Sequence, residues 1–318
     1  MSTPTATAPE LLCMGEPMLE FNQRPPEPDG RPLYLQGHGG DTSNAAIAAA
    51  RSGARAGYIS AIGDDAPGRA FLRLWEQEGV DASTVKRDPA APTGIYFVTH
   101  DEAGHHFTFY RSNSAAARMM PADVPEAAIR RARILHVSGI SQAISTSACD
   151  AVFHAITVAK QAGVAVSYDT NLRKSLWPVS RAAAVMHAAV AMADIALPSL
   201  EDAQALTGLD APDAIADFYL KLAPLVLLKL GAEGAMVATP QGRRTIPGRR
   251  VKAVDATGAG DTFAGAFLAR HLAGDAPEQA ALYANTAAAL ATTGYGAVAP
   301  IPRADAVRAA MASAARLG

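Results

Sequence analysis

The stretch that decides the fold runs from residue 254 to residue 267 and reads Val254-Asp255-Ala256-Thr257-Gly258-Ala259-Gly260-Asp261-Thr262-Phe263-Ala264-Gly265-Ala266-Phe267. Its first half is small and prone to turns, and its second half predicts an apolar helix from residue 262 to about residue 271. A glycine-rich turn that opens into a helix presents unpaired backbone N–H groups at the positive end of the helix dipole. The stretch therefore predicts an anion site, where Asp261 is placed to accept a proton from a hydroxyl that attacks a bound phosphate.

A simpler interpretation of this stretch is structural. Gly258 and Gly260 would then only make a tight turn, and Asp261 would only cap the helix. The stretch is not a Walker A loop, because no Gly-Lys-Ser/Thr follows it. Nor is it a dinucleotide fingerprint, because Phe263 stands where the third glycine belongs. Evidence from other segments is needed to separate the two interpretations.

The composition is typical of a soluble globular protein, with 318 residues, 49% apolar residues and 18% charged residues. A net charge of −2 gives no electrostatic footprint for nucleic acid or an acidic membrane, so we expect neither as a partner. The two cysteines, Cys13 and Cys149, exclude a disulfide scaffold and suit a reducing, cytoplasmic location. Residues 1–10 lack the features of a signal peptide and predict a flexible tail.

Apolar strands alternate with helical stretches from residue 129 onward, with strands expected at 134–138, 164–169, 195–198 and 225–230. This alternation predicts a buried, mostly parallel sheet, which binds ligands at the carboxyl ends of its strands. Polar loops follow all of these strands, and they read Ser138-Gly139-Ile140-Ser141, Asp169-Thr170-Asn171-Leu172-Arg173, Ser199-Leu200-Glu201-Asp202 and Lys229-Leu230-Gly231-Ala232-Glu233-Gly234. Together with the glycine-rich turn, these loops favour a phosphate-using active site at one rim.

The amino-terminal part adds candidate substrate-side segments. Residues 18–36 are rich in proline and predict a flap, and residues 93–110 predict a hairpin that could close as a lid. Between them, Gly37-His38-Gly39-Gly40-Asp41-Thr42-Ser43-Asn44 precedes a helix expected at 45–51. The polar residues 41–44 suit helix capping, and they equally suit a hydroxyl-rich ligand.

With these motifs the chain resembles the ribokinase-type, phosphofructokinase-B-like family of sugar kinases over roughly residues 11–303. Residues 39–46 match the amino-terminal, sugar-side signature of that family, and residues 255–261 match its carboxy-terminal signature Asp-x-x-Gly-Ala-Gly-Asp. The resemblance implies a ribokinase-like, three-layer α/β/α fold with a doubly wound, mostly parallel sheet. It also implies a single kinase domain over residues 11–318, with a small β lid formed by 18–36 and 93–110.

Within the family, the chain is most similar to the 2-keto-3-deoxygluconate kinases. The segments that carry this similarity are Gly15-Glu16-Pro17-Met18, Phe109-Tyr110-Arg111, Ser114-Ala115-Ala116-Ala117, residues 135–141 and residues 169–177. The resemblance implies ATP-dependent phosphorylation of that sugar acid at its 6-hydroxyl, with ATP and Mg²⁺ as cofactors and a monovalent cation as a further candidate. The lid is also a candidate surface for a homo-oligomer.

The resemblance assigns roles to single residues. Asp261 matches the catalytic base, and the N–H groups of Gly258, Ala259 and Gly260 match the anion hole. Substrate contacts are expected from Gly39, Gly40, Asp41, Asn44, Tyr96, Phe109, Arg111 and Arg173. Nucleotide contacts are expected from Asn171, Arg173, Ser199, Lys229, Gly231, Gly234, Gly258, Gly260 and Asn285, and a water-mediated metal contact from Asp202.

A keto acid needs a positive partner, and guanidinium groups bind carboxylates with two parallel hydrogen bonds. We expect Arg111 to contact the substrate carboxylate, and Arg173 to contact either the substrate or a phosphate. Asp261 needs no strongly raised pKa as the base, since the proton can be transferred late.

The sequence departs from the family pattern at a few positions. Ser199-x-x-Asp202 stands where many members have Asn-x-x-Glu, and Leu172 and Phe109 stand where tyrosine is common. The lost hydroxyl groups leave the preferred sugar open.

Other functions therefore stay under consideration. One is a kinase for a neutral sugar or nucleoside, such as fructose, ribose or adenosine, and another is a non-catalytic sugar sensor on the same fold. An NAD-dependent enzyme is disfavoured by the missing dinucleotide fingerprint.

Overall fold

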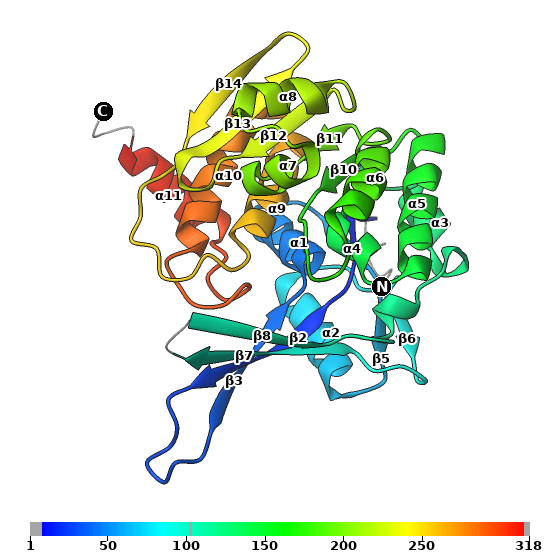
Figure 1. The fold of residues 1–318 in the computed structure, drawn as a ribbon, viewed down its shortest axis with the longest axis vertical. Coiled ribbons are helices and arrows are strands. Elements are labelled where there is room, and N and C mark those ends of the chain that lie inside the picture. Colours follow the sequence, from blue (N-terminus) through cyan, green and yellow to red (C-terminus); the bar gives the residue numbers. More distant parts are fainter. Residues whose placement is uncertain (1–7, 102–103, 315–318) are drawn as a thin grey trace, which may run out of the picture.

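The computed structural model describes residues 8–101 and 104–314, which surround a central eight-stranded sheet (Figure 1). The strand order is β14-β13-β12-β11-β10-β9-β1-β4. The strands are β1 (Leu11–Met14), β4 (Ala56–Ile59), β9 (Ile134–Ser138), β10 (Ala165–Asp169), β11 (Ile195–Ala196), β12 (Leu225–Lys229), β13 (Gly234–Thr239) and β14 (Gly242–Pro247). Neighbours from β4 to β12 pair in parallel, and β13 and β14 are antiparallel. The predicted mostly parallel sheet is confirmed.

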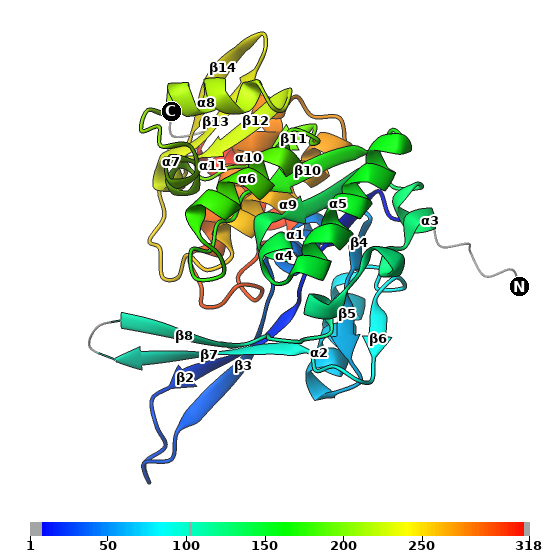
Figure 2. The ribbon, with the colours of Figure 1, turned by 45° about the vertical axis from the view of Figure 1, so that its right-hand side comes forward.

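Helices cover both faces of this sheet (Figures 1 and 2). One face packs against α1 (Asp41–Arg51), α2 (Ala66–Glu78), α9 (Ala259–Leu272), α10 (Pro277–Ala291) and α11 (Ala304–Ala314). The other packs against α3 (Glu126–Ile129), α5 (Thr146–Gln161), α6 (Val179–Val190), α7 (Leu200–Thr207) and α8 (Pro212–Leu220), and the short α4 (Gly139–Ala143) follows β9 on this side.

Side chains that alternate along each strand build the cores on the two faces. In β1, Leu11 and Cys13 enter the first core, with α1 and α9, whereas Leu12 and Met14 enter the second, with α5 and α6. The predicted three-layer α/β/α arrangement is therefore confirmed.

A second, four-stranded sheet extends below the main body (Figure 2). Its strands are β3 (Leu33–Gly39), β2 (Met18–Arg24), β7 (Gly94–Asp101) and β8 (Gly104–Tyr110), in that order. It joins the two segments expected to form a lid, and we call it the lid sheet. Because Glu20 pairs with Tyr96 and Tyr96 with Phe109, these three side chains share one face.

Smaller elements connect these layers. They are the short parallel pair β5 (Ala61–Gly63) and β6 (Lys86–Asp88) and the 3₁₀ turns η1 (Ala116–Arg118), η2 (Pro121–Asp123) and η3 (Gly231–Glu233). Within the described residues, no helix is long and apolar enough to cross a bilayer. Residues 1–7 of the predicted tail lie outside the described residues.

Candidate active site

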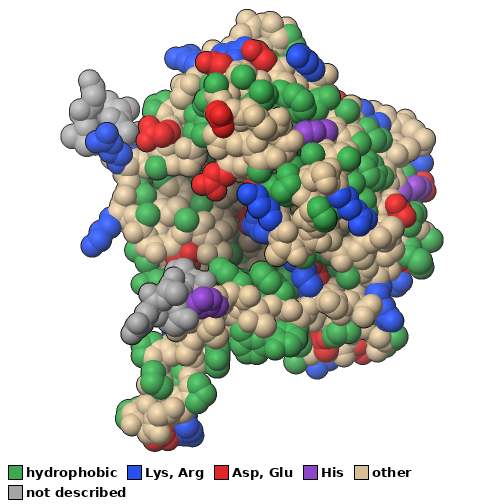
Figure 3. All heavy atoms as spheres, in the orientation of Figure 1, with side chains coloured by type: hydrophobic (Ala, Val, Ile, Leu, Met, Phe, Trp, Pro, Cys, Tyr) green, Lys and Arg blue, Asp and Glu red, His purple; other side chains and the backbone are tan. Residues whose placement is uncertain are grey.

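A cavity of about 540 Å³ lies where the carboxyl ends of the parallel strands face the lid sheet. In Figure 3 it is the hollow near the centre, with charged side chains at its mouth. The predicted site residues that line it are Gly39, Gly40, Asp41, Asn44, Tyr96, Phe109, Arg111, Asn171, Arg173, Lys229, Gly258, Gly260 and Asp261. The structure thus brings together the two sequence signatures, the lid hairpin and the strand-end loops.

Asp261 enters the cavity from the first turn of α9. This helix starts after Gly258, whose φ of 75° is left-handed and favours glycine. Asn44 Nδ2 in α1 donates a hydrogen bond of 2.8 Å to Asp261 Oδ2. The two helices approach closely because Gly265 has no side chain: a Cβ there would lie only 2.1 Å from the carbonyl oxygen of Ala45.

The electrostatic environment makes Asp261 a stronger base than an ordinary aspartate. Burial of the carboxyl and then the negative charge of Asp41 raise the pKa of Asp261 to about 7, against the hydrogen bond from Asn44. The role of base does not require this raised pKa, and the sequence did not predict it. The sequence could not show it, because Asp41 is 220 positions away along the chain and approaches only through the fold.

The glycine-rich turn offers fewer free donors than the sequence suggested. The N–H of Ala259 donates to the carbonyl of Ala256 at 3.1 Å, because this turn must close before α9 begins. In this conformation the N–H of Ala259 is therefore engaged within the turn, and its place in an anion hole stays a prediction. The N–H groups of Gly258 and Gly260 have no acceptor within the described parts of the chain.

Lys229 supplies positive charge beside this turn. Its Nζ donates to Asp169 Oδ2 at 2.6 Å, and a Cβ built on Gly260 would lie 3.6 Å from the same Nζ. Burial raises the pKa of Asp169, and the attraction to Lys229 lowers it in part. The free N–H groups, the helix dipole and this ammonium group together make the turn a site suited to phosphate.

Asp41 does not cap α1. Gly40 holds the cap position without a side-chain hydrogen bond, and a Cβ there would lie 2.5 Å from the carbonyl of Glu16. Instead Asp41 Oδ2 accepts hydrogen bonds from Ser138 Oγ and, at 3.2 Å, from Asn171 Nδ2. The capping interpretation is therefore wrong for Asp41, whose carboxylate faces the cavity.

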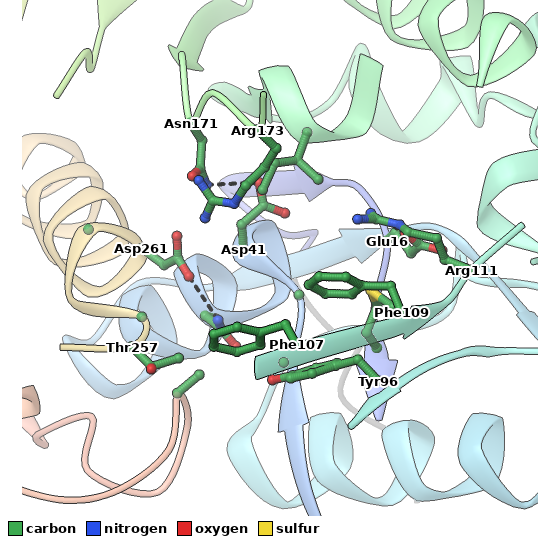
Figure 4. A pocket seen from close by; sticks show the side chains of 18 of the residues that line it. Glu16, Asp41, Tyr96, Phe107, Phe109, Arg111, Asn171, Arg173, Thr257 and Asp261 are labelled. Atoms are coloured by element: carbon green, nitrogen blue, oxygen red, sulfur yellow. Dashed lines mark hydrogen bonds and ion pairs between the residues drawn. The ribbon is translucent and has the colours of Figure 1, made fainter. Parts of the chain in front are cut away.

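The two arginines of the cavity differ in how much of their charge is already used (Figure 4). Arg111 forms an ion pair with Glu16, with Nε 2.8 Å from Oε2, and Ser114 Oγ donates to the other oxygen of Glu16 at 2.5 Å. Arg173 donates only to the backbone carbonyl of Leu172, at 3.0 Å, within the described part of the chain. The contact of Arg111 with a substrate carboxylate stays a prediction, and in this structure Arg173 has fewer hydrogen-bond partners than Arg111.

Aromatic rings of the lid sheet form the floor of the cavity (Figure 4). The ring of Tyr96 lies 5.6 Å from that of Phe109, and its hydroxyl donates to Glu20. Phe107 is an additional lining residue, which could have been found from its position two residues before Phe109 on one strand face.

Other lining residues were not assigned roles from the sequence. They are Glu16, Met18, Ile140, Ser175, Leu176, Ala256, Thr257 and Ala297. All of them except Ala297 lie within segments that carry the family resemblance, so membership in those segments was the available signal. By contrast Leu172, at a departure from the family pattern, is buried and does not line the cavity.

Several predicted nucleotide and metal positions lie outside the cavity; they are Ser199, Asp202, Gly231, Gly234 and Asn285. Asn285 Nδ2 donates to backbone carbonyls of β14, at 2.9 and 3.2 Å, so its amide nitrogen supports the structure, and a contact of Asn285 with the nucleotide stays a prediction. Ser199 caps α7. Among the described residues, no cluster of three or more acidic, histidine or cysteine side chains could hold a metal.

Comparison with known proteins agrees with this arrangement. The family model for PfkB family carbohydrate kinases matches residues 9–304. The chain is 38% identical to a 2-dehydro-3-deoxygluconokinase of Thermoproteus tenax, over 88% of this chain and 87% of that protein. It is 34% identical to fructokinase-1 of Oryza sativa subsp. japonica, over 85% of this chain and 87% of that protein.

Solved structures show the same fold. A ribokinase-like protein from E. coli, crystallised with ATP and Mg²⁺, superposes with a TM-score of 0.88 at 26% identity, over 96% of this chain and 99% of that chain. The family model covers both signatures, every strand of the main sheet and the lid sheet. The chain belongs to the PfkB family of carbohydrate kinases.

Proposed function

We propose that the protein uses ATP to phosphorylate the 6-hydroxyl of 2-keto-3-deoxygluconate, also named 2-dehydro-3-deoxygluconate. The observation that carries this proposal is that Arg173, a guanidinium group with one backbone hydrogen bond in the described chain, shares a cavity with Asp261. A sugar acid has a carboxylate at one end and a primary hydroxyl at the other, so it can satisfy both groups. The Thermoproteus tenax relative supports the same substrate.

The reaction forms a bond between the substrate oxygen and the γ-phosphorus and breaks the bond between that phosphorus and the β–γ bridging oxygen. Asp261 orients the attacking hydroxyl and takes its proton, and Asn44 holds the carboxylate in place. The free N–H groups of Gly258 and Gly260 face the transferring phosphoryl group, next to Lys229. Positioning and charge stabilisation of this kind supply most of the catalysis in phosphoryl transfer.

We assign ATP and Mg²⁺ as the cofactors, since the E. coli structure was solved with both. When bound, Mg²⁺ neutralises charge on the nucleotide phosphates, and it commonly keeps several water ligands. The described residues offer no cage of side chains for it, so we derive no step through the metal. A monovalent cation and an oligomer formed through the lid stay predictions.

Fructose is the second candidate substrate. The pairing of Arg111 with Glu16 favours it, because among the described lid residues that line the cavity this ion pair leaves no unpaired lysine or arginine. The rice fructokinase supports the same alternative.

A coupled assay of ADP release separates the candidates. It would compare 2-keto-3-deoxygluconate, its galacto epimer, fructose, ribose and adenosine. We expect kcat/KM for the better of the two sugar acids to exceed that for fructose by at least about tenfold, the value of one well-placed charged contact. A higher value for fructose would replace the proposal with the alternative. Absence of turnover with all five would favour the sugar sensor.

A further inference from the structure

The loop of residues 169–173, which we call the rim loop, follows β10 and carries Arg173 to the cavity. Its central residue, Asn171, has a φ of 36°, a left-handed conformation that non-glycine residues rarely adopt. Such a conformation persists only where the surrounding structure holds it. The contacts of the rim loop therefore determine where Arg173 points.

Hydrogen bonds hold the rim loop from several sides. The N–H of Asn171 donates to Asp169 Oδ1 at 3.2 Å, and its side chain donates to Asp41. The next N–H, that of Leu172, donates to Asp202 Oδ2 at 3.0 Å. A buried N–H that loses a charged acceptor is costly, so the bond to Asp202 is a strong restraint on this loop.

Asp202 reaches the rim loop from the first turn of α7 and does not line the cavity. The same Oδ2 also lies 3.4 Å from Thr170 Oγ1. We propose that Asp202 is a positioning residue that holds the rim loop and thereby directs Arg173 toward the substrate, in place of the metal contact expected at this position. The proposal rests on the proposed function for the identity of the substrate. The contacts between Asp202 and the rim loop do not depend on that function.

The connection from Asp202 to Arg173 runs through Leu172. The side chain of Leu172 is buried in the second core, and its N–H is held by Asp202. Its carbonyl in turn accepts the hydrogen bond from Arg173 Nη1. Both the backbone before Arg173 and the end of its side chain are therefore held by one residue, Leu172, whose N–H and side chain are themselves restrained.

Two variants separate a positioning role from a metal role. In Asp202→Asn, an amide oxygen still accepts from Leu172 N–H while the charge is lost, whereas Asp202→Ala loses both. We expect Asp202→Ala to raise KM for the best sugar acid by about tenfold with a smaller change in kcat, and Asp202→Asn to restore KM to within about threefold of the wild type. The Mg²⁺ concentration for half-maximal activity should be unchanged in both.

The opposite pattern would overturn the proposal. A metal role predicts that Asp202→Asn is as damaging as Asp202→Ala and that both need more Mg²⁺. Hydrogen exchange of the Leu172 amide, measured without substrate, tests the geometry alone: exchange should be faster in Asp202→Ala than in the wild type and Asp202→Asn. Equal exchange in all three would contradict the role of Asp202 even if the enzyme proved to be a fructokinase. Faster exchange without sugar-acid activity would contradict only the proposed function.

Discussion

Asp261 is the residue on which the chemistry depends. Asp261→Asn keeps the size of the side chain and an acceptor for Asn44 but removes the group that takes the proton. We expect turnover to fall by roughly two or more orders of magnitude with nucleotide binding nearly unchanged. Steady-state kinetics and calorimetric titration with ATP measure the two quantities. Near-normal turnover would contradict the assignment of Asp261 as base.

The raised pKa of Asp261 also predicts how stability depends on pH. Because its folded-state pKa is about 7, above its unfolded value, the stability associated with this group is complete below the unfolded pKa and is lost as pH rises through 7. Asp261→Asn lacks the charge, so at pH 8 its melting temperature should exceed that of the wild type by about 3 °C, a modest value because the carboxylate is partly exposed. The difference should shrink toward pH 4. A difference that does not vary with pH would exclude charge as its cause.

Replacing the two cavity arginines should have different effects on the two substrates. Arg173→Ala should lower kcat/KM for the sugar acid by about 100-fold and for fructose by less than about tenfold. Equal losses would place Arg173 at a phosphate instead. Arg111→Ala should harm both substrates and lower the melting temperature, because it leaves the buried Glu16 without its ion-pair partner. Adding Glu16→Gln to Arg111→Ala should recover part of that stability.

At the scale of residues, a role could be predicted from the sequence where it depends on residues that are close along the chain. The glycine-rich turn and Asp261 are close in sequence, so their chemistry could be read from spacing. The partner of Arg111 could not, because Glu16 is 95 positions away and the two meet only when β8 and β1 are folded together. The hydrogen bond of the Ala259 N–H could not be predicted either, because it closes a turn whose geometry the sequence does not specify.

At the scale of elements, the contact between α1 and α9 controls the site. Gly265→Ala would place a Cβ only 2.1 Å from the Ala45 carbonyl, so the helices must separate. We expect a loss of about 1 to 3 kcal/mol in the free energy of unfolding and lower turnover, because Asn44 moves away from Asp261. Urea denaturation and kinetics measure these effects.

Gly163→Ala is the matched control for that experiment. Gly163 has a φ of 71° and open space around it, so an added Cβ costs only backbone strain of about 1 kcal/mol. Turnover should be unchanged. Wild-type turnover and stability in Gly265→Ala would show that the close helix contact is not needed.

The elements themselves were mostly predictable, because the buried parallel strands are continuous apolar runs. The strand expected at 134–138 is β9 with the same bounds, and α9 begins three residues earlier than expected. The antiparallel pair β13–β14 was not predicted. β14 is an edge strand whose residues are mostly exposed, so it lacks the apolar run that marks the others.

At the scale of the whole molecule, the two cores share the strands of one sheet, so residues 11–318 should unfold as one unit, as the predicted single domain requires. The chain has two tryptophans: Trp75 is buried in the first core and Trp177 in the second. Single-tryptophan variants, Trp75→Phe and Trp177→Phe, report on one core each. We expect the urea transition followed by fluorescence in each variant to coincide with the loss of helical circular dichroism in that variant. Separated transitions would show that the cores unfold independently.

The position of β1 in the sheet has a consequence for synthesis of the protein. This strand is translated before the other strands of its sheet, yet it pairs on one side with β4 and on the other with β9, which begins only at Ile134. A nascent chain shorter than that carries an apolar strand with one open edge, the kind of surface that aggregates or binds chaperones. Productive folding of the amino-terminal third therefore waits for translation of the middle of the chain.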